Sequence, residues 1–231
     1  EDAWHEDVPE ALEESGAEIM FVPNGSPYYR NKYETRLNQM VSRVVETGLP
    51  LIYLNMVGGQ DDQVFDGGTF VLNPGGELAM RLPVFDEAVA HVDFEQTSQG
   101  WRAIPGAITA FPDEWEQDYR VMVESLRDYF RKTGFKKALL GLSGGIDSAI
   151  VATIASDALG PENVRCVMLP SKYTSQASLD DAGEVAQRLG ARLDTVSIKD
   201  PVQAVNHTLA DVFEGTEPGL TEENIQSRLR G

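Results

Sequence analysis

One short loop constrains the fold of this chain more than any other feature of its sequence. The loop reads SGGIDS (Ser143–Ser148); an apolar run, Ala138–Leu142, precedes it, and Asp147–Leu159 has the composition of a helix. Glycines at such a junction let the backbone adopt torsions that other residues avoid and approach a ligand closely. Successive N–H groups can then form an anion-binding concavity at the positive end of the helix. The pattern predicts a phosphate site at the carboxyl end of a parallel strand.

The second half of the chain alternates between strand and helix patterns. After a helix at Tyr119–Lys132, we expect strands at Ala138–Leu142, Arg165–Leu169 and Leu193–Ile198, and helices at Asp147–Leu159, Ser178–Leu189 and from Asp200 onward. Gly160-Pro161 and Gly190 are helix stop signals, and Asp200-Pro201 is a start signal. This order predicts a parallel sheet with crossover helices.

The first half has a different rhythm. Its patterns predict helices at Glu10–Ser15 and Lys32–Thr47, and strands at Ala17–Val22, Leu51–Met56, Thr69–Leu72, Glu77–Leu82 and Ala88–Phe94. In the longer helix, the apolar stripe comprises Leu37, Met40, Val41, Val44 and Val45. We therefore predict an α/β fold in two domains, 1–95 and 119–231. The linker, 96–118, should pack on the surface because it carries Trp101, Phe111 and Trp115.

Composition excludes several classes of protein. The formal net charge of -18 disfavours a nucleic-acid surface, and no apolar run is long enough to span a membrane. The lone cysteine, Cys166, permits no intrachain disulfide, which fits a reducing cytoplasm, and it lies in a strand expected to be buried. The histidines His5, His91 and His207 lack the spacing of metal ligands. Because no Met precedes Glu1-Asp2, we expect the chain to be a segment of a longer protein.

The polar residues of the loop suggest how it would hold a nucleotide. Ser143 and Ser148 offer hydroxyl donors, and Asp147 makes sense beside a polyanion if it binds Mg²⁺. The competing interpretation is a glycine-rich turn with an aspartate N-cap. The sequence context favours the first, with an expected nucleotide-binding set of Gly141, Leu142, Ser143, Gly144, Gly145, Ile146, Asp147 and Ser148.

The loop resembles that of the N-type ATP pyrophosphatases, and among them the NAD synthetases. The resemblance covers SGGIDSAIVATIASDALG (Ser143–Gly160), CVMLPSKYTSQASLDDA (Cys166–Ala182) and ENIQSRLRG (Glu223–Gly231). It implies cleavage of ATP to AMP and pyrophosphate, with Asp147 on Mg²⁺. It also implies that Asn224 and Arg230 contact deamido-NAD. Thr221 would cap their helix, on which Asn224 and Arg228 share one face and Gln226 and Arg230 another.

The first half resembles the nitrilase superfamily in the version fused to NAD synthetase as a glutaminase. The matching segments are Glu1–Tyr28 and Val64–Leu78. The resemblance implies a Glu-Lys-Cys triad whose cysteine directly precedes Glu1, so no catalytic residue of the triad lies within the chain. It also implies that Ser26 and Lys32 contact glutamine, although Lys32 could equally be a surface lysine at a helix start.

Together these resemblances predict the carboxyl-terminal part of an αββα nitrilase-like domain followed by a parallel-sheet ATP-pyrophosphatase domain. The implied function is that of a glutamine-dependent NAD synthetase, a cytoplasmic homo-oligomer that takes ATP, deamido-NAD and glutamine and uses Mg²⁺. It implies no nucleic-acid or membrane partner. Two alternatives stay open: another ATP-dependent amidotransferase with a similar loop, and a segment that binds nucleotide without turnover.

Overall fold

The structure, a computed structural model, describes residues 2–171, 174–215 and 219–230. Some residues of the segments quoted above, namely Glu1, Lys172, Tyr173 and Gly231, lie outside the described residues. The chain forms two compact units, Glu1–Lys132 and Thr133–Gly231, and each is described by itself. Residues 119–132, which the sequence assigned to the second domain, pack within the first unit, so the predicted domain limits stay a prediction.

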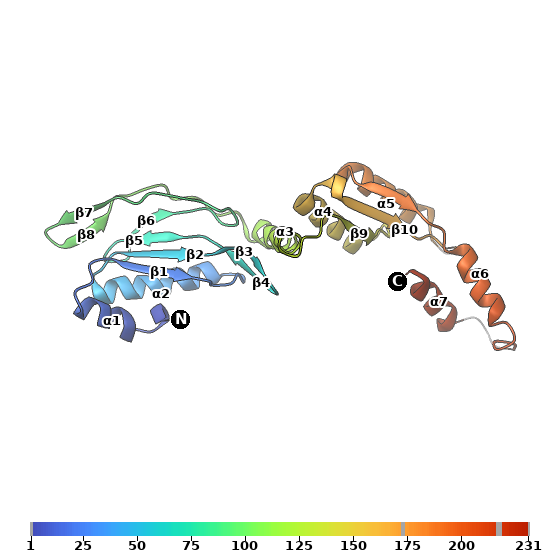
Figure 1. Cartoon of the computed structure of the whole chain (residues 1–231), viewed down its shortest axis with the longest axis horizontal. Helices are drawn as coiled ribbons and strands as arrows, with labels where there is room; N and C mark the ends of the chain where they lie inside the picture. The colour runs from blue at the N-terminus through green and yellow to red at the C-terminus, as the bar shows by residue number, and fades with distance from the viewer. Residues whose placement is uncertain (1, 172–173, 216–218, 231) are drawn as a thin grey trace. The chain divides into compact units, whose positions relative to one another are not determined.

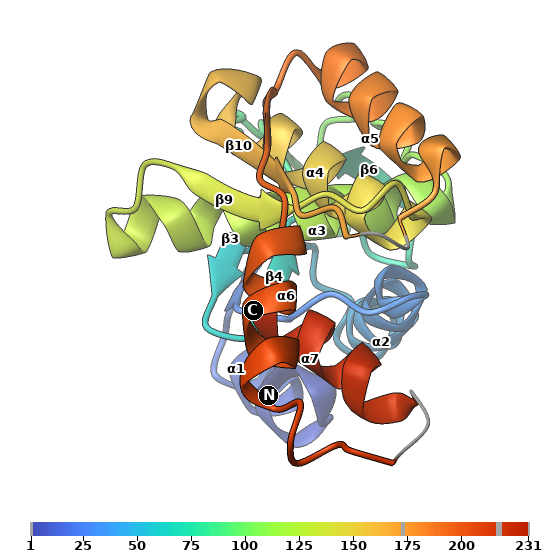
Figure 2. The ribbon, with the colours of Figure 1, turned by 90° about the vertical axis from the view of Figure 1, so that its right-hand side faces the viewer.

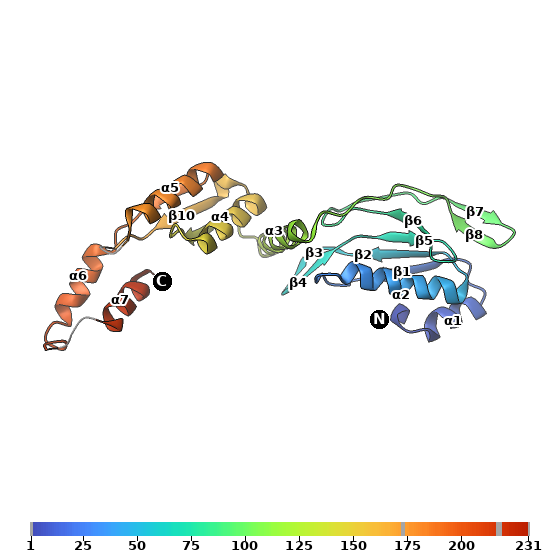
Figure 3. The same ribbon diagram turned by 180° about the vertical axis from the view of Figure 1, so that it is seen from behind.

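The first unit is built on a mixed sheet of order β1-β2-β5-β6 (Figure 1). The strands are β1 (Met20–Asn24), β2 (Leu51–Asn55), β5 (Phe70–Leu72) and β6 (Leu78–Arg81), of which β1 and β2 are parallel and the other pairs antiparallel. Helices α1 (Asp7–Glu14) and α2 (Lys32–Thr47) lie on one side of this sheet, as Figure 3 shows from behind. Met40 and Val44 of α2 pack on Leu51, Tyr53 and Phe70 to form the core.

Two hairpins and one long helix complete the first unit. The first hairpin comprises β3 (Val57–Gln60) and β4 (Gln63–Asp66), and the second comprises β7 (Phe94–Thr97) and β8 (Gly100–Ala103). The helix, α3 (Glu114–Thr133), packs on the first hairpin. The buried carboxylate of Asp128 accepts a hydrogen bond from the Gly59 N–H at 2.9 Å, and it pairs with Arg131 at 2.7 Å. Glycine is required at the neighbouring position because Gly58 has φ +117°.

The second unit is a parallel sheet of order β11-β10-β9 with crossover helices (Figure 2). In chain order its elements are β9 (Ala138–Gly141), α4 (Ile146–Leu159), β10 (Val164–Met168), α5 (Gln176–Leu189), β11 (Arg192–Thr195), α6 (Lys199–Thr208) and α7 (Leu220–Arg230). A 3-10 turn at Pro161–Asn163 follows the helix stop Gly160. Helices α4 and α5 pack against each other and on the sheet, whereas α6 and α7 lie side by side. The predicted strand–helix alternation is therefore confirmed.

Several predictions for the first half were wrong in detail. Residues 88–93 form no strand, although their side chains alternate, because pairing begins only at Phe94. Both hairpins were missed, and the second begins at Phe94, two residues before the predicted linker. Val45 is 59% exposed: it lies five residues, or about 140°, round the helix from the buried Met40. Phe111 packs on the core as expected, whereas Trp115 is 73% exposed.

Candidate functional site

The two glycines of the SGGIDS loop have different backbone conformations. Gly144 has φ +80°, and a Cβ added there would lie 2.3 Å from the Ser178 carbonyl oxygen in α5. Gly145 precedes α4 as its N-cap in an extended conformation, with φ -86° and ψ 156°. The expectation of unusual torsions therefore holds for Gly144 and was wrong for Gly145. Gly144 is needed both for its torsion and because the loop passes against the first turn of α5.

The two serines of the loop bond to each other. The Ser143 N–H donates to Ser148 Oγ at 3.1 Å, and the two hydroxyls lie 3.1 Å apart. Ser148 Oγ in turn donates to the Gly145 carbonyl at 2.9 Å. These hydroxyls brace the loop, so the backbone N–H groups at the start of α4 are fixed in direction. Backbone N–H groups fixed in this way suit an anion-binding turn, because the loop loses little further conformational entropy when a ligand binds.

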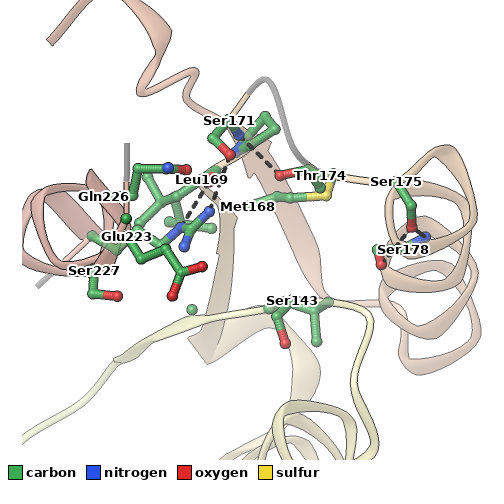
Figure 4. Close-up of a pocket in the computed structure, with 16 residues that line it drawn as sticks. Ser143, Met168, Leu169, Ser171, Thr174, Ser175, Ser178, Glu223, Gln226 and Ser227 are labelled. Carbon is green, nitrogen blue, oxygen red and sulfur yellow. Dashed lines mark hydrogen bonds between the residues drawn. The ribbon is translucent and has the colours of Figure 1, made fainter. Parts of the chain in front are cut away.

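The loop borders a large cavity of about 910 Å³ through Ser143, whereas Gly144, Gly145, Ile146, Asp147 and Ser148 do not line it (Figure 4). Gly141, Leu142 and Ser143 line it from the end of β9. Residues 167–171 line it from the end of β10, and Thr174, Ser175 and Ser178 line it from the start of α5. The Thr174 hydroxyl accepts from the Ser171 N–H at 2.9 Å, and Ser175 caps α5 by accepting from the Ser178 N–H. The cavity thus lies at the carboxyl ends of the parallel strands, where such sheets bind ligands.

Helix α7 forms the opposite wall of the cavity. Its lining residues are Glu223, Gln226, Ser227 and Arg230, and Figure 4 shows the first three on that side. Arg230 Nε donates to the Leu169 carbonyl at 3.3 Å, which joins the end of α7 to the end of β10. Arg230 therefore lines the cavity, and its contact with deamido-NAD stays a prediction. Asn224 is exposed and does not line the cavity. Because α7 begins at Leu220, Thr221 is within its first turn and is not its cap.

Asp147 occupies the second position of α4 and is exposed. It is not the N-cap, so the interpretation of the loop as an aspartate-capped turn fails. Within the described ranges no three His, Cys, Asp or Glu side chains converge. A carboxylate such as that of Asp147 fits Mg²⁺, because that ion usually keeps several waters and binds phosphate oxygens as well.

The first unit places Ser26 in a buried polar network. The Arg36 guanidinium, 1% exposed, donates through Nε to Ser26 Oγ at 3.0 Å and pairs with Asp66 at 2.8 Å. Asn55 accepts from the Ser26 N–H at 2.9 Å and donates to the Ser26 carbonyl at 3.1 Å. Such a buried ion pair is tolerable because each charged atom has a partner. The network fixes the backbone and the hydroxyl of Ser26.

Lys32 lies in an aromatic bracket. Its ammonium group is 4.6 Å from the centre of the Trp4 ring and 4.5 Å from that of Tyr29, whose hydroxyl accepts a hydrogen bond from it at 3.3 Å. The Trp4 carbonyl is in turn held by the Gln39 side chain of α2 at 2.7 Å. Lys32 is therefore not an unconstrained surface lysine. It is held between Trp4 and Tyr29, and its contact with glutamine stays a prediction.

Two family models match the chain in succession. The carbon–nitrogen hydrolase model matches residues 1–103, and the NAD synthase model matches residues 118–231. Over all 231 residues the chain is 64% identical to a glutamine-dependent NAD(+) synthetase from Rhodobacter capsulatus, of which it covers 42%. It is 40% identical over its whole length to the enzyme of that name from Xanthomonas campestris, again covering 42%.

A solved structure agrees with these matches. The glutamine-dependent NAD+ synthetase from Acinetobacter baumannii, in complex with adenosine diphosphate, superposes with a TM-score of 0.90 at 36% identity. That superposition covers 98% of this chain and 43% of the other. The chain belongs to the glutamine-dependent NAD synthetase family. The predicted fold class, a nitrilase-like domain and an ATP-pyrophosphatase domain, is confirmed, and the chain spans less than half the length of these relatives.

Sequence reasoning missed Arg36 and its partner Asp66, which hold Ser26 in place. Arg36 stands on the buried face of α2, between Tyr33 and Met40, where an arginine needs a buried partner. That misfit with the apolar stripe was the available signal. Its partner Asp66 is 30 residues away, and nothing local connects the two.

The prediction that Cys166 lies in a buried strand is confirmed. Cys166 is fully buried in β10, and burial raises the pKa of its thiol, so it stays protonated at neutral pH. The histidines His5, His91 and His207 are exposed. No helix in the described part of the chain has the length and apolar character to cross a bilayer.

Proposed function

We propose that the chain works as part of a glutamine-dependent NAD synthetase. The carboxylate of the nicotinic-acid ring in deamido-NAD attacks the α-phosphorus of ATP, and pyrophosphate leaves. Ammonia, freed by hydrolysis of the glutamine side-chain amide, then attacks the acyl carbon and displaces AMP. The first step is needed because a free carboxylate is a poor electrophile with a poor leaving group. Because the chain spans 42% of the Rhodobacter relative, the tests below use the enzyme of full length.

The observation that carries the proposal is the braced loop at the mouth of the cavity. Ser143 and Ser148 hold the backbone at the start of α4, and Gly144 brings it against α5. Gly141–Ser148 would bind the ATP, with the N–H groups at the start of α4 on its phosphates, because the Leu142 and Ser143 N–H groups already donate to the Val167 carbonyl and to Ser148 Oγ. The adenosine would lie towards the ends of β9 and β10. The ADP bound by the Acinetobacter relative supports a nucleotide of this class.

Asp147 is the residue that would hold Mg²⁺ in this proposal. Its carboxylate stands in the first turn of α4, at the positive end of the helix. A divalent cation there would supply charge neutralisation for the phosphates. What the chain itself contributes is an exposed carboxylate beside the N–H groups at the start of α4.

Arg230 would hold the dinucleotide substrate on the opposite wall. Its guanidinium suits a pyrophosphate or a carboxylate, and Gln226, one turn earlier, lies on the same side of α7. Asn224 is kept as a second contact from the family resemblance, although in this structure it lies outside the cavity lining.

In the first unit, Ser26 and Lys32 would bind glutamine. The fixed hydroxyl and backbone of Ser26 would orient the ligand, and the Lys32 ammonium would pair with its α-carboxylate. Enclosure of the released ammonia from water would prevent its protonation and loss.

A matched pair of arginines on α7 tests the proposed dinucleotide site. Arg230→Ala should raise the KM for deamido-NAD about ten- to hundredfold, because a charge-assisted contact is lost, and should leave the KM for ATP nearly unchanged. Arg228→Ala is the control, since Arg228 is exposed and does not line the cavity. The assay follows NAD formation with ammonium as the nitrogen source. Equal effects of the two variants would remove Arg230 from the site.

Two further parts of the proposal, the cellular location and the oligomeric state, rest on composition and on the family resemblance. The single cysteine in the chain fits a cytoplasmic location, and a homo-oligomer is expected from the family resemblance. Analytical ultracentrifugation of the full-length enzyme would check the second.

A further inference from the structure

The loop between β1 and α2 carries both proposed glutamine contacts. It begins after Asn24, contains Ser26, and ends at Asn31, which has φ +63° and directly precedes Lys32. Its two ends are fixed in different ways. Ser26 is held by Arg36 and Asn55, whereas Lys32 is held by the rings of Trp4 and Tyr29.

The middle of this loop is held by one carboxylate from another part of the chain. Tyr28 donates its hydroxyl proton to Asp118 Oδ1 at 2.9 Å, and Arg30 donates through Nε to Asp118 Oδ2 at 2.8 Å. The two oxygens of one side chain thus hold two residues of the loop. Trp115, one turn earlier on α3, lies under the Arg30 guanidinium at 4.9 Å, and Glu114 pairs with Arg30 at 3.5 Å.

The position of Asp118 is unusual for a residue that touches this loop. It is the first residue matched by the NAD synthase model, whereas Tyr28 and Arg30 lie within the carbon–nitrogen hydrolase match. All three nevertheless belong to the first compact unit, because α3 packs there up to Lys132. The far end of α3 is anchored independently by Asp128 on the β3–β4 hairpin. With both ends of the helix fixed, the direction of the Asp118 carboxylate is fixed too.

We propose that Asp118 is a positioning residue for glutamine: it fixes Tyr28 and Arg30 so that Ser26 and Lys32 present their polar groups at a constant separation. The proposal rests on the proposed glutamine site. Asp118 acts through these neighbours and does not itself touch the substrate. Arg30 and Tyr28 hold the pKa of the Asp118 carboxyl below its usual range, so it is charged at neutral pH. The pair is partly exposed, with side chains of Arg30 and Asp118 47% and 24% accessible, so it contributes little to folding.

The test is Asp118→Ala in the full-length enzyme. We expect the KM for glutamine to rise about five- to tenfold, with kcat for ammonium-driven NAD synthesis unchanged. Asp118→Asn retains one oxygen acceptor and should give an intermediate KM. Tyr28→Phe removes one of the two donors, so its effect on KM should not add fully to that of Asp118→Ala. Glu116→Ala is the matched control on α3, because Glu116 pairs with Arg120 within the helix and not with the loop.

Three outcomes would overturn the proposal. The first is an unchanged KM for glutamine in Asp118→Ala. The second is an equal loss of glutamine- and ammonium-driven synthesis, which a purely structural role would produce. The third is full additivity with Tyr28→Phe. Lys32→Ala separates this inference from the proposed function: if it leaves the KM for glutamine unchanged, the glutamine site itself is wrongly placed. If Lys32→Ala raises that KM and Asp118→Ala does not, only the role of Asp118 is refuted.

Discussion

The two adjacent glycines of the phosphate loop are not equivalent at the scale of the single residue. A methyl group on Gly144 meets the backbone of α5, 2.3 Å from a carbonyl oxygen, and the torsion of +80° disfavours any side chain. A methyl group on Gly145 meets only Ser143 Oγ at 3.4 Å, with an ordinary torsion. Backbone cannot move aside as a flexible side chain can. The shared sequence GG therefore contains one required glycine and one replaceable glycine as far as folding is concerned.

This difference predicts losses of stability of different size. Gly144→Ala should lower the free energy of unfolding of the second unit by at least about 2 kcal/mol, because strain and overlap add. Gly145→Ala should change it by less than about 1 kcal/mol. Urea unfolding monitored by circular dichroism measures both. Similar losses in the two variants would show that the loop does not pass against α5 as described.

Residues whose partners are distant in sequence set the limit of what could be predicted. The SGGIDS loop is a local pattern, so its place after a strand and before a helix could be derived from the residues themselves. The contacts that fix Ser26 join residues up to 30 positions apart, and Tyr28 and Asp118 are 90 positions apart. No periodicity reports such pairs. The sequence pointed to Ser26 and Lys32 only through a family resemblance. The misfit of Arg36 with the apolar stripe named no partner, and nothing pointed to Asp118.

At the scale of elements, the same distinction separates the strands that were predicted from those that were not. β9 and β10 are short, mostly apolar segments, β11 follows a helix stop, and crossover connections determine the pairing of all three. β3 carries Gly58 and Gly59, which leave no alternation to detect, yet its partner β4 follows after a short turn. Residues 88–93 alternate but pair with nothing in the described sheets. Alternation is a property of one segment, whereas a strand needs a partner.

The packing of α3 on the β3–β4 hairpin gives a prediction at this scale. Gly58→Ala places a methyl group 2.5 Å from the buried Asp128 carboxylate, in addition to the strain of φ +117°. Gly100→Ala is a matched control, because Gly100 has φ +105° and nothing within 4 Å of an added Cβ. Gly58→Ala should therefore lower the unfolding free energy of the first unit by about 1–3 kcal/mol more than Gly100→Ala. Equal losses would mean that strain alone acts and that α3 does not press on the hairpin.

At the scale of the whole molecule, the proposed function divides the reaction between the two family segments. The first unit would supply ammonia, and the second would activate the carboxylate that accepts it. Glutamine-driven synthesis needs both chemistries, whereas synthesis from an ammonium salt needs only the second. The choice of nitrogen source therefore determines whether an assay reports on both units or on the second unit alone.

This separation predicts different results for one variant in each unit of the full-length enzyme. Lys32→Ala should lose most glutamine-driven NAD synthesis at fixed glutamine concentration, because a charge-assisted contact is worth about 1.5–3 kcal/mol, or roughly ten- to hundredfold in affinity. Ammonium-driven synthesis should continue.

Asp147→Asn should lose NAD formation with both nitrogen sources, together with pyrophosphate release, while circular dichroism shows an intact fold. The same variant tests the proposed role of Asp147 in cation binding. Because Asp147→Asn would weaken that binding, raising the Mg²⁺ concentration should restore part of its activity. Near-normal turnover in Asp147→Asn would refute the assignment of that carboxylate, and equal loss with both sources in Lys32→Ala would return Lys32 to a structural role.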